Sequence, residues 1–170
     1  QLWAWRTAVV HGGKYNKNEV TMRHLNVGGI LIAGALVAMN MPAASPDIRL
    51  VDAVKKSDKA AIQALLPQHI DPNIPDVDGA TALHWAAHRD DLETVDLLIR
   101  AGAKVNTAND YGVTALSLAC SNGNAAMVDK LLRAGANPNA ALVRTGETVL
   151  MTCVRTGNIE AVKLLVARGA

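Results

Sequence analysis

The apolar positions between Thr81 and Gly102 follow two helical faces in succession. They are Leu83, Ala86 and Ala87 on the first face, then Leu92, Val95 and Leu98 on the second. Asp90 and Asp91 interrupt the pattern, and Gly102 stands where a residue with positive φ ends a helix without steric cost. Thr81 can cap the first helix by accepting from backbone N–H groups that lack intrahelical partners. The pattern therefore predicts two short helices joined by a tight turn.

The same pattern recurs when Gly79, Gly112 and Gly146 are aligned, at spacings of 33 and 34 residues. The coinciding positions include Thr81, Thr114 and Thr148, then Leu83, Leu116 and Leu150, then Val95, Val128 and Val162. A degenerate copy without the Gly-x-Thr start precedes them at 46–75. One helix pair cannot bury its apolar face alone, so stacked copies are predicted to share one continuous core.

Two segments of the chain, "DVDGATALHWAA" and "LLIRAGAKVN", resemble the unit of the ankyrin-repeat family, which reads Asp-x-x-Gly-x-Thr-Pro-Leu-His-x-Ala-Ala, then Val-x-x-Leu-Leu, then Gly-Ala-x-x-Asn. The resemblance implies an all-α ankyrin-repeat solenoid of stacked helix-turn-helix units with short hairpin loops over residues 45–170. Its expected units are 46–75, 76–108, 109–142 and 143–170. We expect the last to be truncated, with further repeats or another domain after it.

The chain departs from the family unit at several positions. The family's proline is replaced by Ala82, Ala115 and Val149, and its histidine occurs only as His84, with Ser117 and Met151 at the equivalent positions. The third full unit has one additional residue before Gly146, and "LVRTG" replaces the usual acidic tip. The resemblance therefore leaves the conformation of that hairpin open.

Composition and charge support an all-α chain without a nucleic-acid partner. Half of the residues are hydrophobic, but there is no Phe, and the Ala- and Leu-rich composition favours helix. Before Ser45 there are four basic residues and one acid, a net +3; from Ser45 onward there are 13 basic and 14 acidic residues, a net −1. The repeat region thus carries no basic stripe of the kind that binds nucleic acid.

The segment "MRHLNVGGILIAGALVAMNMPAAS" has the layout of a secretory signal peptide, with one Arg, an apolar run and small residues after it. We predict that 22–44 is such a signal and that the protein is periplasmic or secreted, of an exported bacterial type. The apolar run over 27–39 is short for a membrane span of roughly 20 residues. The alternatives are an uncleaved membrane anchor through 25–41 and a buried helix. Residues 1–21 are interpreted as an upstream or artefactual segment, with a real extension as the alternative.

The residues that could carry chemistry have simpler structural interpretations. Family resemblance gives His84 and Thr81 a role in bonding local backbone and steadying the loop. Cys120 and Cys153 fall on the inner faces of adjacent repeats; helices pack roughly 10 Å apart and a disulfide needs Cα atoms within about 7 Å. We therefore predict buried, unpaired thiols, with a redox role as the alternative. Trp85 is expected to pack between repeats, or else to contact a partner; since a buried indole N–H needs an acceptor, we expect one edge of the ring to face solvent.

No nucleophile elbow, phosphate loop, HExxH sequence or Ca²⁺ loop is found, so we predict no catalytic residue, cofactor or metal. The resemblance assigns partner contacts to variable loop-tip and helix positions. They are Val77, Asp78, Ala80, His88, Arg89, Asp110, Tyr111, Val113, Ser121, Asn122, Arg144, Thr145, Glu147, Arg155 and Thr156. Tyr111 is the best single contact candidate, although these residues could also serve only to keep the surface soluble.

Taken together, these features predict a non-catalytic protein-interaction scaffold exported to the periplasm, with a protein partner. One alternative is an accessory ankyrin module of a larger enzyme or electron-transfer protein. Another is a cytosolic repeat protein held to a membrane by its apolar segment.

Overall fold

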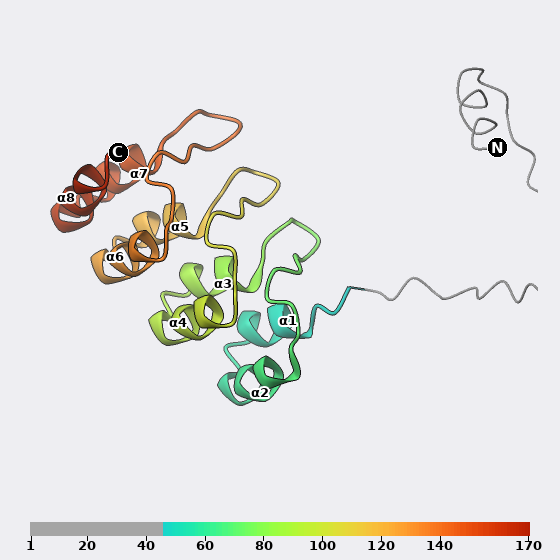
Figure 1. The fold of residues 1–170 in the computed structure, drawn as a ribbon. Helices are drawn as coiled ribbons and strands as arrows, with labels where there is room; N and C mark the ends of the chain where they lie inside the picture. The colour runs from blue at the N-terminus through green and yellow to red at the C-terminus, as the bar shows by residue number, and fades with distance from the viewer. Residues whose placement is uncertain (1–45) are drawn as a thin grey trace, which may run out of the picture. The chain divides into compact units, whose positions relative to one another are not determined.

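Residues 46–170, which the computed structural model describes, form four stacked helix pairs joined by extended loops (Figure 1). Residues 1–21 and the predicted signal segment 22–44 lie outside the described residues. The predicted all-α repeat solenoid is confirmed. The helices are α1 Arg49–Lys55, α2 Lys59–Leu65, the 3-10 helix η1 Leu66–Gln68, α3 Ala82–His88, α4 Leu92–Arg100, α5 Ala115–Asn122, α6 Ala125–Arg133, α7 Val149–Thr156 and α8 Ile159–Ala167. Every helix of residues 46–170 is too short or too polar to cross a bilayer.

The helix starts follow from side-chain capping. In each full unit the first helix begins after a threonine, and the hydroxyls of Thr114 and Thr148 accept hydrogen bonds from the backbone N–H group three residues later, each at 3.2 Å. The second helices begin after an Asp or Asn whose side chain accepts from the third residue beyond it; these caps are Asp91, Asn124 and Asn158. Such caps satisfy N–H groups that the helix itself leaves unpaired. The predicted breaks between helices are therefore confirmed.

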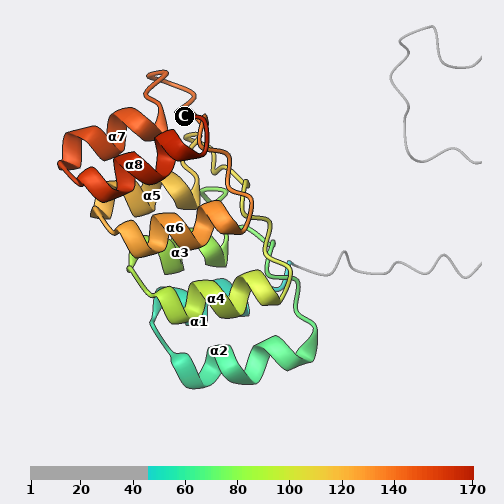
Figure 2. The same cartoon turned by 60° about the vertical axis from the view of Figure 1, so that its left-hand side comes forward.

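The helix pairs form two layers along the stack. Each first helix packs on the first helix of the next unit, α1 on α3, α3 on α5 and α5 on α7, and each second helix packs on its own first helix (Figure 2). Leucine and valine side chains from both layers meet in one cluster; fully buried members include Leu83, Val95, Leu116, Leu131 and Leu165. Since this cluster runs through all four pairs, the predicted continuous core is confirmed.

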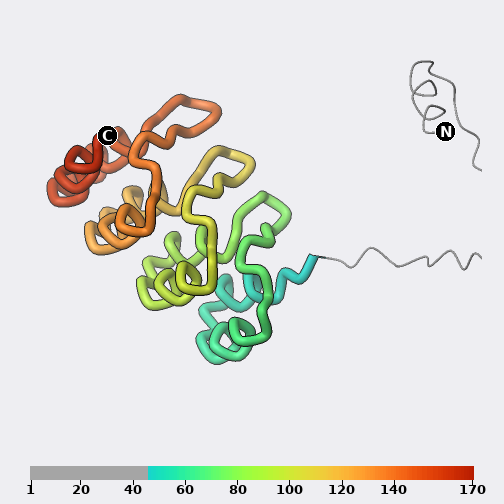
Figure 3. The backbone as a smooth tube through the Cα atoms, in the orientation of Figure 1, coloured from blue at the N-terminus to red at the C-terminus, as the bar shows by residue number. Residues whose placement is uncertain are grey.

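Three loops project on the same side of the stack, next to the first helices (Figure 3). In the second and third loops an antiparallel bridge closes a hairpin, between Ala108 and Thr114 and between Ala141 and Thr148. The first loop turns back in the same way, where the Asp76 N–H donates to the Ala80 carbonyl at 2.8 Å, and the three are called the first, second and third hairpins. The third hairpin keeps this bridge and holds its additional residue in the tip, where the Leu142 N–H donates to the Glu147 carbonyl at 2.9 Å. The departure of this unit from the family sequence thus lengthens the tip without opening the hairpin.

Asparagines at a period of 33 residues connect neighbouring units outside the core. The Asn106 side chain accepts from the Asn137 N–H at 2.7 Å and donates to the Gly135 carbonyl at 2.9 Å. Asn73 makes the equivalent pair of bonds with Lys104 and Gly102. Each asparagine therefore ties the end of its own unit to the end of the second helix in the next one.

The prediction that the two cysteines are unpaired is wrong. Cys120 on α5 and Cys153 on α7 form a disulfide, with their Cα atoms 4.6 Å apart. The first helices approach more closely at this point than the general helix spacing used for the prediction. Ala87 and Ala119 occupy the equivalent positions at the preceding interface and are fully buried, and such small side chains allow backbones to come close together.

The last helix pair exposes apolar side chains where earlier pairs are covered. Val154 is 58% exposed, whereas Ala87 and Cys120 at the equivalent positions are fully buried. Met151 is 59% exposed, and its equivalent His84 only 3%. The difference arises because each earlier unit is covered on this face by the unit that follows it.

Candidate functional site

The surface made by the hairpin tips and the first helices carries most of the predicted contact residues. Val77 and Tyr111 stand out at 94% and 51% exposure. Two further tip positions, Val113 and Glu147, are half-buried and therefore less exposed than these two. Ala80 is buried, so its side chain offers little area to a partner. The exposed predicted positions are Val77, Asp78, His88, Arg89, Asp110, Tyr111, Ser121, Asn122, Arg144, Thr145, Arg155 and Thr156.

Asp76 organises the first hairpin and links three parts of the chain. One carboxylate oxygen accepts from the N–H groups of Asp78 and Ala80, at 3.0 and 2.9 Å. The other accepts from the Trp85 indole N–H at 3.0 Å and pairs with the Lys55 ammonium at 2.7 Å. Burial by itself would raise the pKa of Asp76, but these four hydrogen bonds outweigh it and lower the pKa to about 2.

Trp85 is held in place by this carboxylate and by Lys55. The Lys55 ammonium lies 4.7 Å from the centre of the indole ring, in cation–π contact. The edge of the His88 ring faces Trp85 at 6.0 Å between ring centres. Trp85 also packs against the apolar core as a partly buried side chain. The ring therefore packs on the core as expected, and its N–H is bonded to Asp76.

His84 connects its own helix start to the next hairpin. Its Nδ1 accepts from the Thr81 N–H and hydroxyl, at 3.1 and 2.9 Å, and its Nε2 donates to the Val113 carbonyl at 3.0 Å. Burial lowers the pKa of the imidazole, more than the hydrogen bonds to the Val113 and Thr107 backbone raise it. These contacts confirm a structural role for His84, and they also join two adjacent repeats.

The second hairpin repeats the geometry of the first without its charge. The Asn109 side-chain oxygen accepts from the N–H groups of Tyr111 and Val113, at 3.1 and 2.9 Å. Asn109 thus takes the place of Asp76, 33 residues later. The two tips also touch, because the Asp110 N–H donates to the Asp78 carbonyl at 3.2 Å.

An ion pair joins the third hairpin to α7. Arg155 and Glu147, both predicted contact residues, lie 3.0 Å apart. Glu147 also accepts from the Thr152 hydroxyl at 3.2 Å. The structure therefore brings these two positions together as partners of each other.

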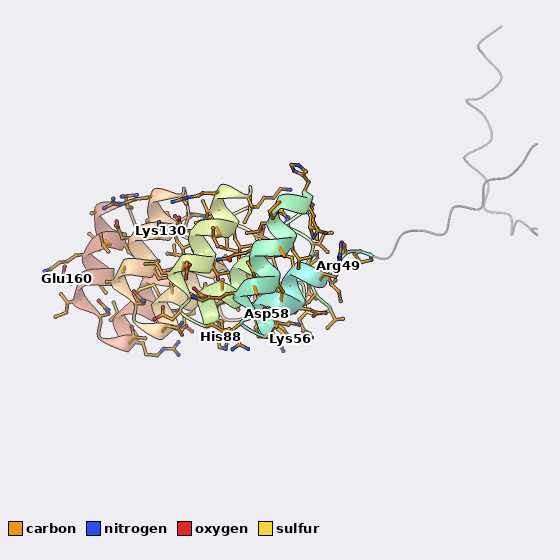
Figure 4. All side chains as sticks on the ribbon, turned by 90° about the horizontal axis from the view of Figure 1, so that it is seen from below. Arg49, Lys56, Asp58, His88, Lys130 and Glu160 are labelled. Atoms are coloured by element: carbon orange, nitrogen blue, oxygen red, sulfur yellow. A yellow bond between two sulfur atoms is a disulfide. The ribbon has the colours of Figure 1, made fainter. Side chains whose placement is uncertain are left out.

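Several of the predicted helix positions bond to the neighbouring backbone. The Arg89 guanidinium donates to the Lys55 carbonyl, and the Asn122 amide donates to the carbonyls of Ala87 and His88. The hydroxyls of Ser121 and Thr156 donate to carbonyls of their own helices. Among these positions His88 makes no such backbone bond through its ring, and Figure 4 shows it on the same edge of the stack as Lys56.

A shallow pocket of about 220 Å³ opens between the second and third units. Its walls come from α3, α5 and the first two hairpins, and most of them are apolar or aromatic. The lining residues are Ala80, His84, Trp85, His88, Asn109, Val113 and Leu118. Three of these residues, Ala80, His88 and Val113, are among the variable positions predicted to contact a partner, but residue spacing does not show that Trp85 and Leu118 line one pocket.

Within residues 46–170, no three His, Cys, Asp or Glu side chains converge in an arrangement that could hold a metal ion. The polar side-chain atoms buried in this region all have hydrogen-bond partners. The exposed tips and the pocket are the candidate binding features on the hairpin side of the stack.

Comparison with known proteins agrees with this geometry. A family described as "Ankyrin repeats (3 copies)" matches residues 50–141, and one described as "Ankyrin repeat" matches residues 145–170. No curated protein matches the chain.

Proposed function

The chain belongs to the ankyrin-repeat family, and on that premise we propose that it is a non-catalytic scaffold that binds a protein partner. Ankyrin repeats are generally protein–protein interaction modules. The observation that carries the proposal is the row of exposed apolar and polar side chains on the hairpin tips, led by Val77 and Tyr111. Side chains of this kind in neighbouring tips give contact area on a rigid stack.

The rigidity of the surface supports the same proposal. Asp76 and Asn109 each fix a tip through two hydrogen bonds to its backbone. His84 bonds one unit to the next hairpin. A surface fixed in this way loses little conformational entropy when a partner binds, which favours affinity.

Crosslinking from defined positions tests the scaffold. A photoreactive amino acid at Tyr111 of the full chain in its native host should capture one protein in high yield. The same group at Arg133, an exposed position on α6, is the matched control and should capture much less of it. Equal capture from both positions, or none from Tyr111, would contradict a partner on the hairpin side.

We also propose that the scaffold is exported to the periplasm. The layout of 22–44 supports this, as does the buried disulfide between Cys120 and Cys153, because disulfides persist in oxidising compartments. Mass spectrometry of the protein from periplasmic and cytosolic fractions tests it. The expected species is periplasmic, begins after residue 40 and carries the disulfide; a cytosolic species that retains Met22 would overturn the proposal.

A further inference from the structure

We propose that the pocket between Trp85 and Leu118 takes one large apolar side chain of an extended partner segment, and that basic side chains flanking it contact Asp78 and Asp110. This inference rests on the proposed scaffold function and names the chemistry of its partner. Three features carry it, namely the walls of the pocket, the charge beside it and the contrast with the next repeat.

The walls of the pocket suit an apolar side chain. Trp85 and Leu118 are partly buried side chains that pack on the core, and Val113 closes the hairpin side. The volume of about 220 Å³ has room for a single side chain of the size of Leu or Phe. Burial of such a side chain removes its apolar surface from water, which can anchor a segment.

The Trp85 wall is fixed before any partner arrives. Its indole N–H is bonded to Asp76, and its ring lies under the Lys55 ammonium. Lys55 and Asp76 pair at 2.7 Å, so the two charges beside Trp85 compensate each other. The pocket therefore keeps its shape without an occupant.

The charge beside the pocket is negative and uncompensated. Asp78 and Asp110 are exposed, sit on touching hairpin tips, and form no ion pair with any residue of 46–170. A methyl group built on Gly79 would lie 2.6 Å from an Asp110 carboxylate oxygen, so this carboxylate stands directly beside the first hairpin. Two neighbouring carboxylates repel each other, and a Lys or Arg of the partner would relieve that repulsion.

The equivalent place between the third and fourth units lacks these properties. Ser121 stands there for His88, and Thr152 stands for Leu118. Glu147 is already paired with Arg155 and bonded to Thr152. The side chains at that position are polar and already paired with each other. Of these two junctions, the one between the second and third units is therefore the one suited to an apolar anchor.

Three capped seven-residue peptides probe this chemistry on the full chain. The first has a central Leu flanked by two Lys among alanines; the second replaces the Leu by Ala; the third replaces both Lys by Glu. Nitrogen-15 NMR follows the Trp85 indole and the Val113 and Leu118 amides. The Lys–Leu peptide should bind at least about tenfold more tightly than either of the others. Equal affinities, or no saturable shift with the Lys–Leu peptide up to about 5 mM, would overturn the proposal.

Charge variants give the matched control. The double variant Asp78→Asn with Asp110→Asn should lose most of the preference for Lys over Glu. Glu160→Gln, a single carboxylate removed at the far end of the stack (Figure 4), should keep it. If Glu160→Gln lowers the preference as much as the double variant does, general charge explains the binding and the pocket does not.

The crosslinking experiment separates failure of this inference from failure of the scaffold. A partner that is still captured at Tyr111 with undiminished yield in the double variant and in Leu118→Ala would overturn the pocket chemistry and leave the scaffold intact. Absence of capture in the unsubstituted chain would overturn the scaffold itself.

Discussion

Cys120 and Cys153 join α5 to α7 through a buried disulfide, which ties the last helix pair to the unit before it. The last pair also exposes Val154 and Met151, which the equivalent positions of earlier units keep covered. The disulfide therefore adds a covalent link to the apolar contacts that hold α7 on α5.

Removing the disulfide should loosen the last pair. By the loop-entropy relation, a crosslink across 33 residues contributes about 3–4 kcal/mol to the free energy of unfolding. The variant Cys120→Ala with Cys153→Ala should lose about that much in urea denaturation. A thiol reductant should lower the midpoint of the unsubstituted protein toward that of the variant and leave the variant unchanged; equal midpoints without reductant would contradict the prediction.

Replacement of His84 by Ser should remove the hydrogen bond to the Val113 carbonyl and should also remove one source of the pH dependence of stability. Ser is the residue that the next repeat uses at this position, where Ser117 donates to Thr114. At pH 8 the loss of the bond to the Val113 carbonyl should cost about 1 kcal/mol. Burial holds the pKa of folded His84 below its ordinary 6.5, so the unfolded chain binds the proton more readily and the protein loses stability as the pH falls below about 6.5.

The free energies of unfolding of the His84→Ser and unsubstituted proteins should therefore converge between pH 8 and pH 5. Chemical denaturation at four or five pH values measures this. His88→Ser, at an exposed histidine on the same helix, is the control for loss of an imidazole from α3. A constant difference across the range would show that the buried imidazole is not what titrates.

The period of the apolar positions was sufficient to predict stacked helix pairs with a shared core, and the family resemblance implied the ankyrin-type solenoid with its hairpin loops. Thr81, Thr114 and Thr148 mark helix starts in the sequence, and the same threonines are N-caps in the structure. These features are local, so a single chain reveals them. The 3-10 turn over Leu66–Gln68 lies in the degenerate copy, where no aligned position indicated it.

The candidate site was less accessible to prediction because its contacts join residues far apart in the sequence. Asp76 meets Lys55 from the preceding unit and Trp85 from the following helix, and spacing alone shows neither contact. The disulfide was missed for a related reason: a general helix spacing was applied to an interface lined by alanines. The alanines Ala87 and Ala119, at the equivalent positions of the preceding interface, were the available indication that neighbouring first helices come close together.

Replacement of Asp76 by Asn should destabilise the protein at neutral pH and much less in acid. The pKa of Asp76 is about 2 in the folded protein against an ordinary value of 3.8. Its ionised form therefore contributes stability above about pH 4, which is lost as the pH falls through 2. The difference corresponds to about 2 kcal/mol.

Acid titration of stability from pH 6 to pH 2 measures this contribution. The curves for Asp76→Asn and the unsubstituted protein should approach each other between pH 4 and pH 2. Asp78→Asn removes a nearby exposed carboxylate and should stay close to the unsubstituted curve throughout. Curves for Asp76→Asn that run parallel to it would show that the Lys55 and Trp85 contacts do not depend on the charge of Asp76.

Two glycines at equivalent hairpin positions should tolerate alanine to different degrees. Gly112 and Gly146 both have positive φ, +80° and +67°, so alanine is strained at either, by about 1–2 kcal/mol. At Gly112 the new methyl group would also lie 2.5 Å from the Val143 backbone nitrogen and 2.7 Å from a Val143 methyl group, whereas at Gly146 it meets nothing within 4 Å. Gly112→Ala must therefore push the second and third hairpins apart. We expect it to lower the free energy of unfolding by at least about 1 kcal/mol more than Gly146→Ala, measured by urea denaturation; equal losses would mean that the tips are not packed against each other in solution.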